Sequence, residues 1–243
     1  MSKIKIEKKN IKNIKYGDII VKMHFDSETI FTFHLLYGYK YKCKMKWGDG
    51  SNDNINYFDE TTNSNITHTY QSGDYYLKIE GLCETLEIIN NNNLMEIVSW
   101  GTTNLKILNF NNSMNLSKLP NEHGNLKNVK NFNGTFYNCG LETIPGGLFK
   151  ANSIATDYQS VFQLCPLKKI PLDLFEHNYN ITNLKYAFNA CSSLTGCAPD
   201  IWNTLTQVTN YDGCFANCSG LENFSQKGNC VDQIPHLWTI IDD

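Results

Sequence analysis

Arginine is absent from this chain of 243 residues, so all 21 of its basic side chains are lysines. The chain therefore lacks the planar guanidinium fork that makes bidentate contacts with phosphate, carboxylate and guanine. Its net charge of −3 also gives no concentrated basic field to attract a polyanion. Together these two absences argue against nucleic acid as a partner.

Long apolar runs are missing as well, because no segment approaches the roughly 18 consecutive apolar residues of a membrane span. The first residues are rich in lysine, as in the first part of a secretory signal. No apolar stretch of about 7–15 residues follows before Tyr16-Gly17-Asp18. We therefore expect a solvated basic tail over residues 1–14, no signal peptide, no membrane insertion and synthesis in the cytoplasm.

What is present is the composition of a globular protein, with 41% hydrophobic and 19% charged residues. Alternation with a period of two dominates the first ninety residues and predicts strands. It is clearest over residues 39–47, where Tyr, Cys, Met and Trp alternate with lysines, and it recurs at 19–25, 31–37 and 75–79. Short alternating strands between polar turns indicate an antiparallel β-sandwich.

Three motifs follow one another in this segment. Trp47-Gly48-Asp49-Gly50-Ser51 ends the lysine-rich strand, His68-Thr69-Tyr70 comes next, and Gly73 precedes a further strand. The two glycines of the first motif allow the positive φ of a tight turn, which the Asp49 carboxylate can cap. Together the motifs resemble the PKD family of immunoglobulin-like domains over residues 15–85. The resemblance implies a spacer or binding module in which His68 is a structural hydrogen-bonding residue.

The rest of the chain repeats a Phe-x-x-Cys element followed by Leu-x-x-Ile-Pro or a variant of it. Phe136, Phe162, Phe188 and Phe215 are spaced by 26, 26 and 27 residues, and the cysteines at 139, 165, 191 and 218 keep the same spacing. Looser Leu-x-x copies begin at residues 94, 105, 116 and 126. Because one copy cannot bury its own apolar side, we expect the copies to stack, with the cysteines aligned on neighbouring turns. The Leu-x-x-Ile segments should then form a parallel sheet with strands about 4.8 Å apart.

These elements resemble the BspA-type leucine-rich repeats over about residues 95–225. The resemblance implies a surface, adhesion or host-recognition protein whose repeats do not catalyse reactions. The expected fold class is mainly β with some α, an N-terminal antiparallel β-sandwich of the Ig-like/PKD type followed by a C-terminal leucine-rich-repeat solenoid. We place the solenoid at residues 86–225 and a C-terminal cap at 226–243, with a rigid junction because no flexible linker separates the two parts.

The cysteines predict packing and no chemistry. The chain has nine cysteines, and without a signal peptide this odd number favours reduced thiols over a disulfide framework. The four cysteines of the repeat should be small buried side chains. Cys197, Cys214 and Cys230 lie outside the repeat pattern, and a zinc site there is the alternative. Because no Cys-x-x-Cys occurs, we expect no metal.

Catalytic signatures are not found either. The chain has no Gly-x-Ser-x-Gly, P-loop, His-Glu-x-x-His or Gly-x-Gly-x-x-Gly motif, and its six histidines are scattered. Asp49 in its turn lacks the several oxygen ligands that Ca²⁺ requires. We therefore expect no catalytic residues, no cofactor and no enzymatic activity.

The exposed positions of the repeats remain as a surface that a partner could bind. In a stacked repeat, the two x positions of each Leu-x-x-Ile segment vary while the frame stays fixed. The candidate partner-binding residues at these positions are Lys106, Lys118, Glu142, Thr143, Lys168, Lys169, Thr195, Glu222 and Asn223. Exposed tyrosines at 158, 179, 186 and 211 could anchor a contact. The alternative is that these positions are only solvated or pack between repeats.

The function that these features predict is non-enzymatic recognition or assembly. Two adhesion-type modules without an export signal fit a bacteriophage virion component, such as a head-fibre, decoration or tail-associated protein, which is made in the host cytoplasm and released by lysis. Its partners would be other virion subunits or a host surface protein or glycan. The alternative is a bacterial adhesin of the BspA-like type at the cell surface, or a cytoplasmic interaction protein of the same fold. The oligomeric state and the ligand are left open.

Overall fold

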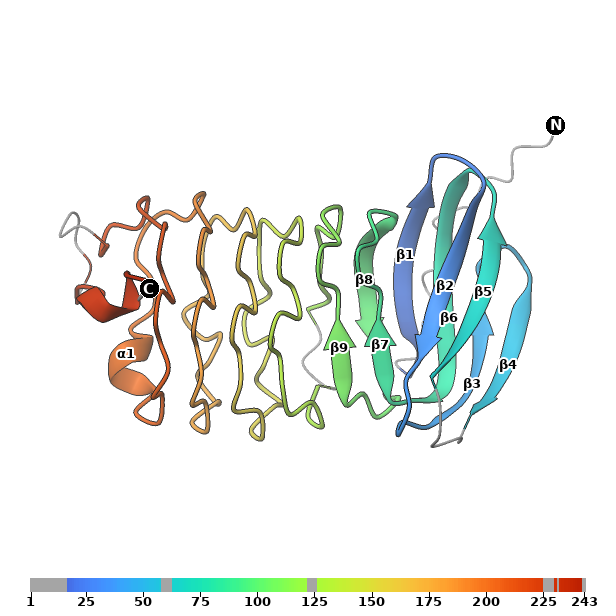
Figure 1. Cartoon of the computed structure of the whole chain (residues 1–243), viewed down its shortest axis with the longest axis horizontal. Helices are drawn as coiled ribbons and strands as arrows, with labels where there is room; N and C mark the ends of the chain where they lie inside the picture. Colours follow the sequence, from blue (N-terminus) through green and yellow to red (C-terminus); the bar gives the residue numbers. More distant parts are fainter. Residues whose placement is uncertain (1–16, 58–62, 122–125, 225–229, 231, 242–243) are drawn as a thin grey trace.

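The computed structural model describes residues 17–57, 63–121, 126–224, 230 and 232–241, and the predicted basic tail at 1–14 lies outside them. The protein is mainly β, with antiparallel sheets and almost no helix (Figure 1). The expected helix content is limited, within the described residues, to α1 (Ile201–Thr204) and one 3-10 turn (His236–Trp238). The C-terminal half is largely coil.

Two antiparallel sheets form the N-terminal part. The larger has the order β4-β3-β6-β1-β8, and the smaller pairs β2 with β5. The strands of the larger sheet are β4 (Asn52–Tyr57), β3 (Tyr41–Lys46), β6 (Gly73–Cys83), β1 (Ile19–Phe25) and β8 (Leu94–Trp100), and those of the smaller are β2 (Thr29–Leu35) and β5 (Ser64–Tyr70). The alternating segments thus predicted β1, β2, β3 and part of β6, whereas β4 and β5 were not predicted.

The two sheets share one apolar core. Alternate residues of β1, β2 and β3 are buried because successive side chains of a strand point to opposite faces. The ring of Phe31 on β2 lies 6.3 Å from the ring of Trp47, which follows β3. The ring of Phe25 on β1 stacks on Tyr70 of β5 at 4.4 Å. The inner faces of the two sheets are therefore in direct contact.

The turn after β3 has the predicted conformation. Gly48 and Gly50 have φ angles of 93° and 100°, and the Asp49 carboxylate accepts a hydrogen bond from the Ser51 amide at 2.8 Å. His68 Nε2 lies 2.8 Å from Asp49 Oδ2, and its ring stacks on Trp47 with the centroids 4.7 Å apart. The contacts of His68 are thus structural ones that tie β5 to this turn.

Strand β8 joins the sheets to the C-terminal half of the chain. We call each repeated segment of that half a coil. Its residues pair with β1 in the antiparallel sheet, and Glu96 also forms a parallel bridge with Lys118. Before it, β7 (Thr85–Glu87) pairs in parallel with β9 (Ile107–Asn109). Hydrogen bonding therefore runs across the boundary predicted at residues 85 and 86.

The coils stack through one column of backbone hydrogen bonds, which we name the Phe column. Its members donate their amides to the following coil and are Ile88, Phe110, Phe136, Phe162, Phe188 and Phe215, with acceptors Asn109, Thr135, Val161, Ala187, Cys214 and Trp238. The neighbouring Phe rings are stacked at 5.4–5.8 Å from Phe110 to Phe215. Figure 1 shows the coils following one another along the long axis of the molecule. The predicted stack already began at residue 86 through looser Leu-x-x copies, but Ile88 and Phe110 were not identified as members of the column because they lack the Phe-x-x-Cys spelling.

The repeat cysteines line up on consecutive coils, as predicted. The thiols of Cys139, Cys165, Cys191 and Cys218 lie 3.0–3.1 Å from the Phe carbonyl of the preceding coil. Ser113 takes the same position earlier, and its hydroxyl donates to the Ile88 carbonyl at 2.8 Å. Burial raises the pKa of Cys139 and of Cys218 to about 12, so the thiols stay protonated and can donate.

Each full coil bends at two residues with positive φ. One precedes the cysteine, at Asn138, Leu164, Ala190 and Asn217, and the other lies four residues earlier, at Gly134, Ser160, Tyr186 and Gly213. A leucine or a tyrosine rarely adopts this conformation. Glycine and asparagine at the equivalent positions favour it, but its recurrence at Leu164 and Tyr186 means that local sequence alone does not set the bend.

The parallel sheet expected from the Leu-x-x-Ile segments is not formed as regular strands. Those segments are joined only by isolated bridges and single hydrogen bonds. The looser copies at Leu105 and Leu126 belong to other parts of their coils, since Lys106 bonds to Glu84 and the carbonyls of Leu126 and Val129 accept from Asn152. Apolar spacing alone could not distinguish these positions, because a coil has more than one inward-facing side.

Candidate partner-binding face

The structure brings most of the predicted partner residues onto one face, which we name the Leu-x-x-Ile face. Backbone bonds run from Ser117 to Met95, from Lys168 to Glu142, from Thr195 to Lys168 and from Glu222 to Gly196, at 2.8–3.1 Å. The predicted residues placed on this face are Lys118, Glu142, Thr143, Lys168, Lys169, Thr195 and Glu222, and all are exposed. They come from successive coils, so a partner could contact several at once.

Asn223 was wrongly predicted to be open to a partner. It is only 2% exposed, and its side-chain amide accepts from the Ala198 amide at 3.1 Å and donates to the Ala198 carbonyl at 3.3 Å. A buried backbone needs hydrogen-bond partners, and here the side chain supplies them in place of a neighbouring strand. The position therefore links two coils.

Lys106 is exposed but lies away from this face. Its amide bonds to the Glu84 carbonyl at 2.7 Å, and its ammonium group lies 2.7 Å from the Glu84 carboxylate, which is almost fully buried. The lysine compensates a buried charge, which is costly to leave unpaired. Its role in the described structure is internal.

The four tyrosines proposed as anchors differ in exposure. Tyr158 is fully buried between Phe132 and Phe149, and this burial raises its pKa. Tyr179 is 64% exposed, Tyr186 is half-buried, and Tyr211 stacks on Trp238 at 5.1 Å. Only Tyr179 has the wide exposure that the prediction assumed.

The charges on the Leu-x-x-Ile face are mixed. Lys168 pairs with Glu142 of the preceding coil, and both side chains are more than half exposed. Such a pair adds little stability. In the described part of the chain, Lys118 and Lys169 form no ion pair within 4.0 Å. The face therefore offers isolated ammonium groups beside a neutralised pair.

The prediction of reduced thiols is wrong for Cys197 and Cys230, which form a disulfide with a Cα–Cα distance of 5.6 Å. The other seven cysteines, Cys214 included, are free and buried. Spacing could not reveal this pair because 33 residues separate the two cysteines and only the stacking of the last coil brings them together. The disulfide holds the C-terminal segment against the coil that contains Cys197.

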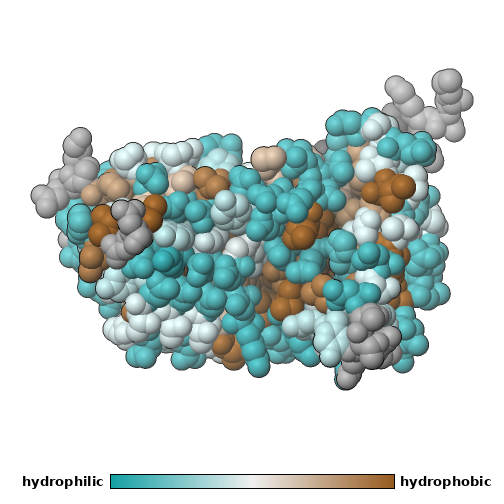
Figure 2. Space-filling view, viewed as in Figure 1, coloured by the Kyte–Doolittle hydropathy of each residue, from teal (hydrophilic) through white to brown (hydrophobic). Residues whose placement is uncertain are grey.

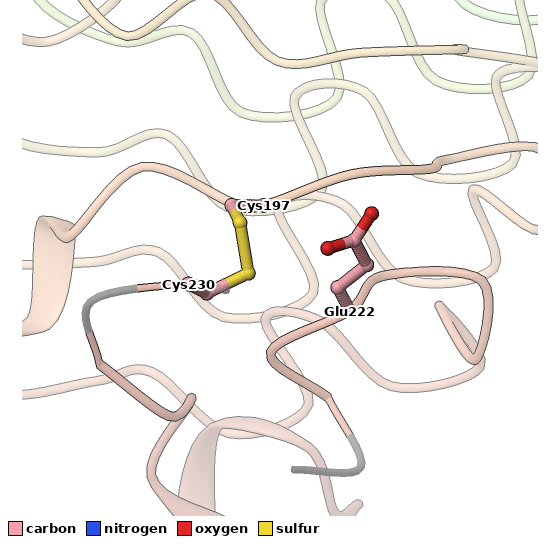
Figure 3. Close-up of side chains that lie close together, drawn as sticks. All are labelled: Cys197, Glu222 and Cys230. Atoms are coloured by element: carbon pink, nitrogen blue, oxygen red, sulfur yellow. A yellow bond between two sulfur atoms is a disulfide. The ribbon is translucent and has the colours of Figure 1, made fainter. Parts of the chain in front are cut away.

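Glu222 lies beside this disulfide (Figure 3). The two sulfurs and a Glu222 carboxylate oxygen lie within 4.8 Å of one another, a grouping that could hold a metal ion. Sulfur binds zinc as a thiolate, and in the disulfide neither sulfur is one. In this oxidised state the group offers a metal only one carboxylate.

The C-terminal segment continues the stack beyond Phe215. The ring of Trp238 lies 6.3 Å from that of Phe215, and the Phe215 amide donates to the Trp238 carbonyl. Residues 225–229, 231 and 242–243 of the predicted cap lie outside the described residues.

The face is suited to non-covalent contact, through exposed charges, hydroxyl groups and the aliphatic stems of lysines. No helix in the described ranges is long and apolar enough to cross a membrane. No protein-family model, curated protein or solved structure matches the chain.

Proposed function

We propose that this protein is a non-enzymatic recognition or assembly module that binds other proteins through the Leu-x-x-Ile face. The observation that carries the proposal is the combination of a fixed frame with variable exposed residues. The Phe column and the aligned cysteines repeat from coil to coil, while the exposed positions change from Lys118 to Glu142 and Lys168. Repeat scaffolds use this arrangement for extended binding surfaces.

We also propose finer assignments for the two parts of the fold. The facing antiparallel sheets and the Trp47, Asp49 and His68 contacts support an Ig-like sandwich of the PKD type over residues 15–85. The inter-coil bonds and the stacked Phe rings support a leucine-rich-repeat solenoid of the BspA type over residues 86–225, followed by a cap. Modules of both kinds occur in proteins that bind a partner or act as spacers.

We place this module in a bacteriophage virion, where its partners would be neighbouring virion subunits or a host surface molecule. Mass spectrometry of purified virions from the source organism tests this placement. After cross-linking through amines, Lys118, Lys168 and Lys169 should be joined to another virion protein. Absence of the protein from virions would refute the placement, and cross-links that avoid the Leu-x-x-Ile face would refute the proposed surface.

A second function, adhesion at a bacterial cell surface, is favoured by the Cys197–Cys230 disulfide. Disulfides persist in oxidising environments, which include the cell exterior. Fractionation of cells that lack the phage distinguishes the two proposals, because only an adhesin should be displayed on their envelope.

A further inference from the structure

The hydrogen bonds of the Leu-x-x-Ile face are interrupted at one place. Ser117 bonds to Met95 on one side, and Lys168 bonds to Glu142 on the other. Between them, no backbone bond joins residues 117–119 to residues 142–143 in the described part of the chain. In the other coils, the amide of the first x residue donates to a carbonyl of the preceding coil. The equivalent bond here would run from the Glu142 amide to the Ser117 carbonyl, and it is not formed. The Phe column of the same two coils is intact, since Phe110 bonds to Thr135.

A groove of about 600 Å³ lies at this interruption. Glu96 and Val98 of β8 form one side, residues 118–121 the next, and residues 143–145 the other. Figure 2 shows a hollow with hydrophobic residues near the middle of the molecule, where the coils after β8 lie. The volume is within the range of specific binding sites, about 300–1,000 Å³.

The chemistry of the groove selects its occupant. Leu119 and Ile144 are 9% and 7% exposed and give it an aliphatic floor, while Glu96 and Lys118 place one charge of each sign on its lining. A polyanion or a polycation would meet a like charge there, and none of its lining residues is aromatic. An extended peptide matches both the aliphatic floor and the mixed charges, because its side chains alternate. Its main chain can also bond to strand edges.

We propose that this groove binds an extended segment of a partner protein as an added strand. An aliphatic side chain of the segment packs on Leu119 and Ile144, and its main chain pairs with backbone groups at the interruption. Charged residues of the segment face Glu96 and Lys118. This inference rests on the proposed recognition function and names the part of the face that binds the partner.

The test uses the full chain and a displayed library of random ten-residue peptides as the probe. We expect enrichment of peptides in which aliphatic residues alternate with polar ones. For an enriched peptide, Thr143→Trp should weaken binding about tenfold or more, which corresponds to about 1.4 kcal/mol. Thr143 is exposed on the groove lining, so the bulky ring blocks the groove without entering the core.

Thr156→Trp is the matched control. Thr156 is also an exposed threonine, and it lies outside the groove and outside the Leu-x-x-Ile face. It should leave the affinity within twofold, and circular dichroism should show both variants folded. A library that yields no enriched peptide, or peptides that bind Thr143→Trp as well as the wild type, overturns the groove assignment. A third variant, Lys169→Trp, lies on the Leu-x-x-Ile face but outside the groove. Peptides that bind Thr143→Trp as well as the wild type but are lost with Lys169→Trp would overturn the groove while supporting recognition by the face.

Discussion

The strands β1–β6 and the coils after β8 satisfy the same backbone groups in different ways. In the strands, antiparallel pairs such as β1 with β6 form ladders, and side chains alternate between a core and solvent. In the coils, single hydrogen bonds join equivalent positions of neighbouring coils, such as Phe136 and Val161. Each coil therefore depends for these bonds on the coil before it and the coil after it.

This difference means that damage should spread differently in the two parts. The two sheets share one core through Phe31 and Trp47, so a lost contact there weakens both sheets. A coil shares its ring contacts only with adjacent coils, as Phe162 does with Phe136 and Phe188. Four experiments test this contrast.

The largest effect should come from Phe162→Ala, which removes a ring stacked on both sides. We expect a loss of about 3–5 kcal/mol in the free energy of unfolding, because the coil cannot collapse around the cavity. Amide exchange should speed up in the coils from Phe136 to Phe215 and much less in β1–β6. Leu172→Ala, at an 80% exposed position of the same coil, is the control and should change stability by less than about 0.5 kcal/mol. Equal loss of protection in β1–β6 would contradict the contrast.

Removal of the disulfide should have the next largest effect, confined to the C-terminal end. Cys197→Ser should cost about 2–4 kcal/mol, because the C-terminal segment is no longer tied to its coil. Amide exchange near Ile234 and Trp238 should rise first. Dithiothreitol should destabilise the wild type and leave the variant unchanged. If the reductant weakens both to the same extent, other groups account for the effect.

Cys165→Ser should have a smaller effect, about 1 kcal/mol, because a hydroxyl can replace the thiol as donor to the Phe136 carbonyl. Ser113 already does this in an earlier coil. Cys165→Leu, which overpacks the same site, should cost about 1–3 kcal/mol. Urea unfolding of both variants measures the difference. A serine variant less stable than the leucine variant would mean that the thiol does more than pack and donate.

The smallest effect is on the pH dependence of stability, and it concerns only the N-terminal sheets. Burial acts to raise the pKa of Asp49, but hydrogen bonds from Ser51 and His68 outweigh it and hold the pKa below its usual 3.8. A carboxyl with a lowered pKa stabilises the fold above its unfolded-state pKa, and this contribution is lost as the pH falls through the folded-state value. Asp49→Asn should therefore flatten the fall in stability below about pH 4. Urea unfolding between pH 3 and 6 checks this, and an unchanged acid dependence would refute it.

How much of the candidate face could be predicted depended on the periodicity of the sequence. The x positions of the strict copies, such as Glu142 and Lys168, were placed on one exposed face because the 26-residue spacing fixes them relative to Phe136 and Phe162. Lys106 was misplaced because a Leu-x-x-Leu spacing recurs on another side of the coil. Asn223 was misjudged because a polar side chain can be buried where it replaces a strand partner.

Local sequence patterns were sufficient to predict the alternating strands β1, β2 and β3, the turn at Gly48 and Gly50, and the alignment of Cys139 with Cys165. Each of these follows from residues close in the chain or repeated at a fixed interval, so the sequence contains the whole signal. Packing between distant segments is needed to explain the position of β8 between sheet and coils, the Cys197–Cys230 disulfide, the positive φ of Leu164 and Tyr186, and the groove beside Lys118. Those features arise where coils meet other segments, and a contact between distant segments depends on how both are packed.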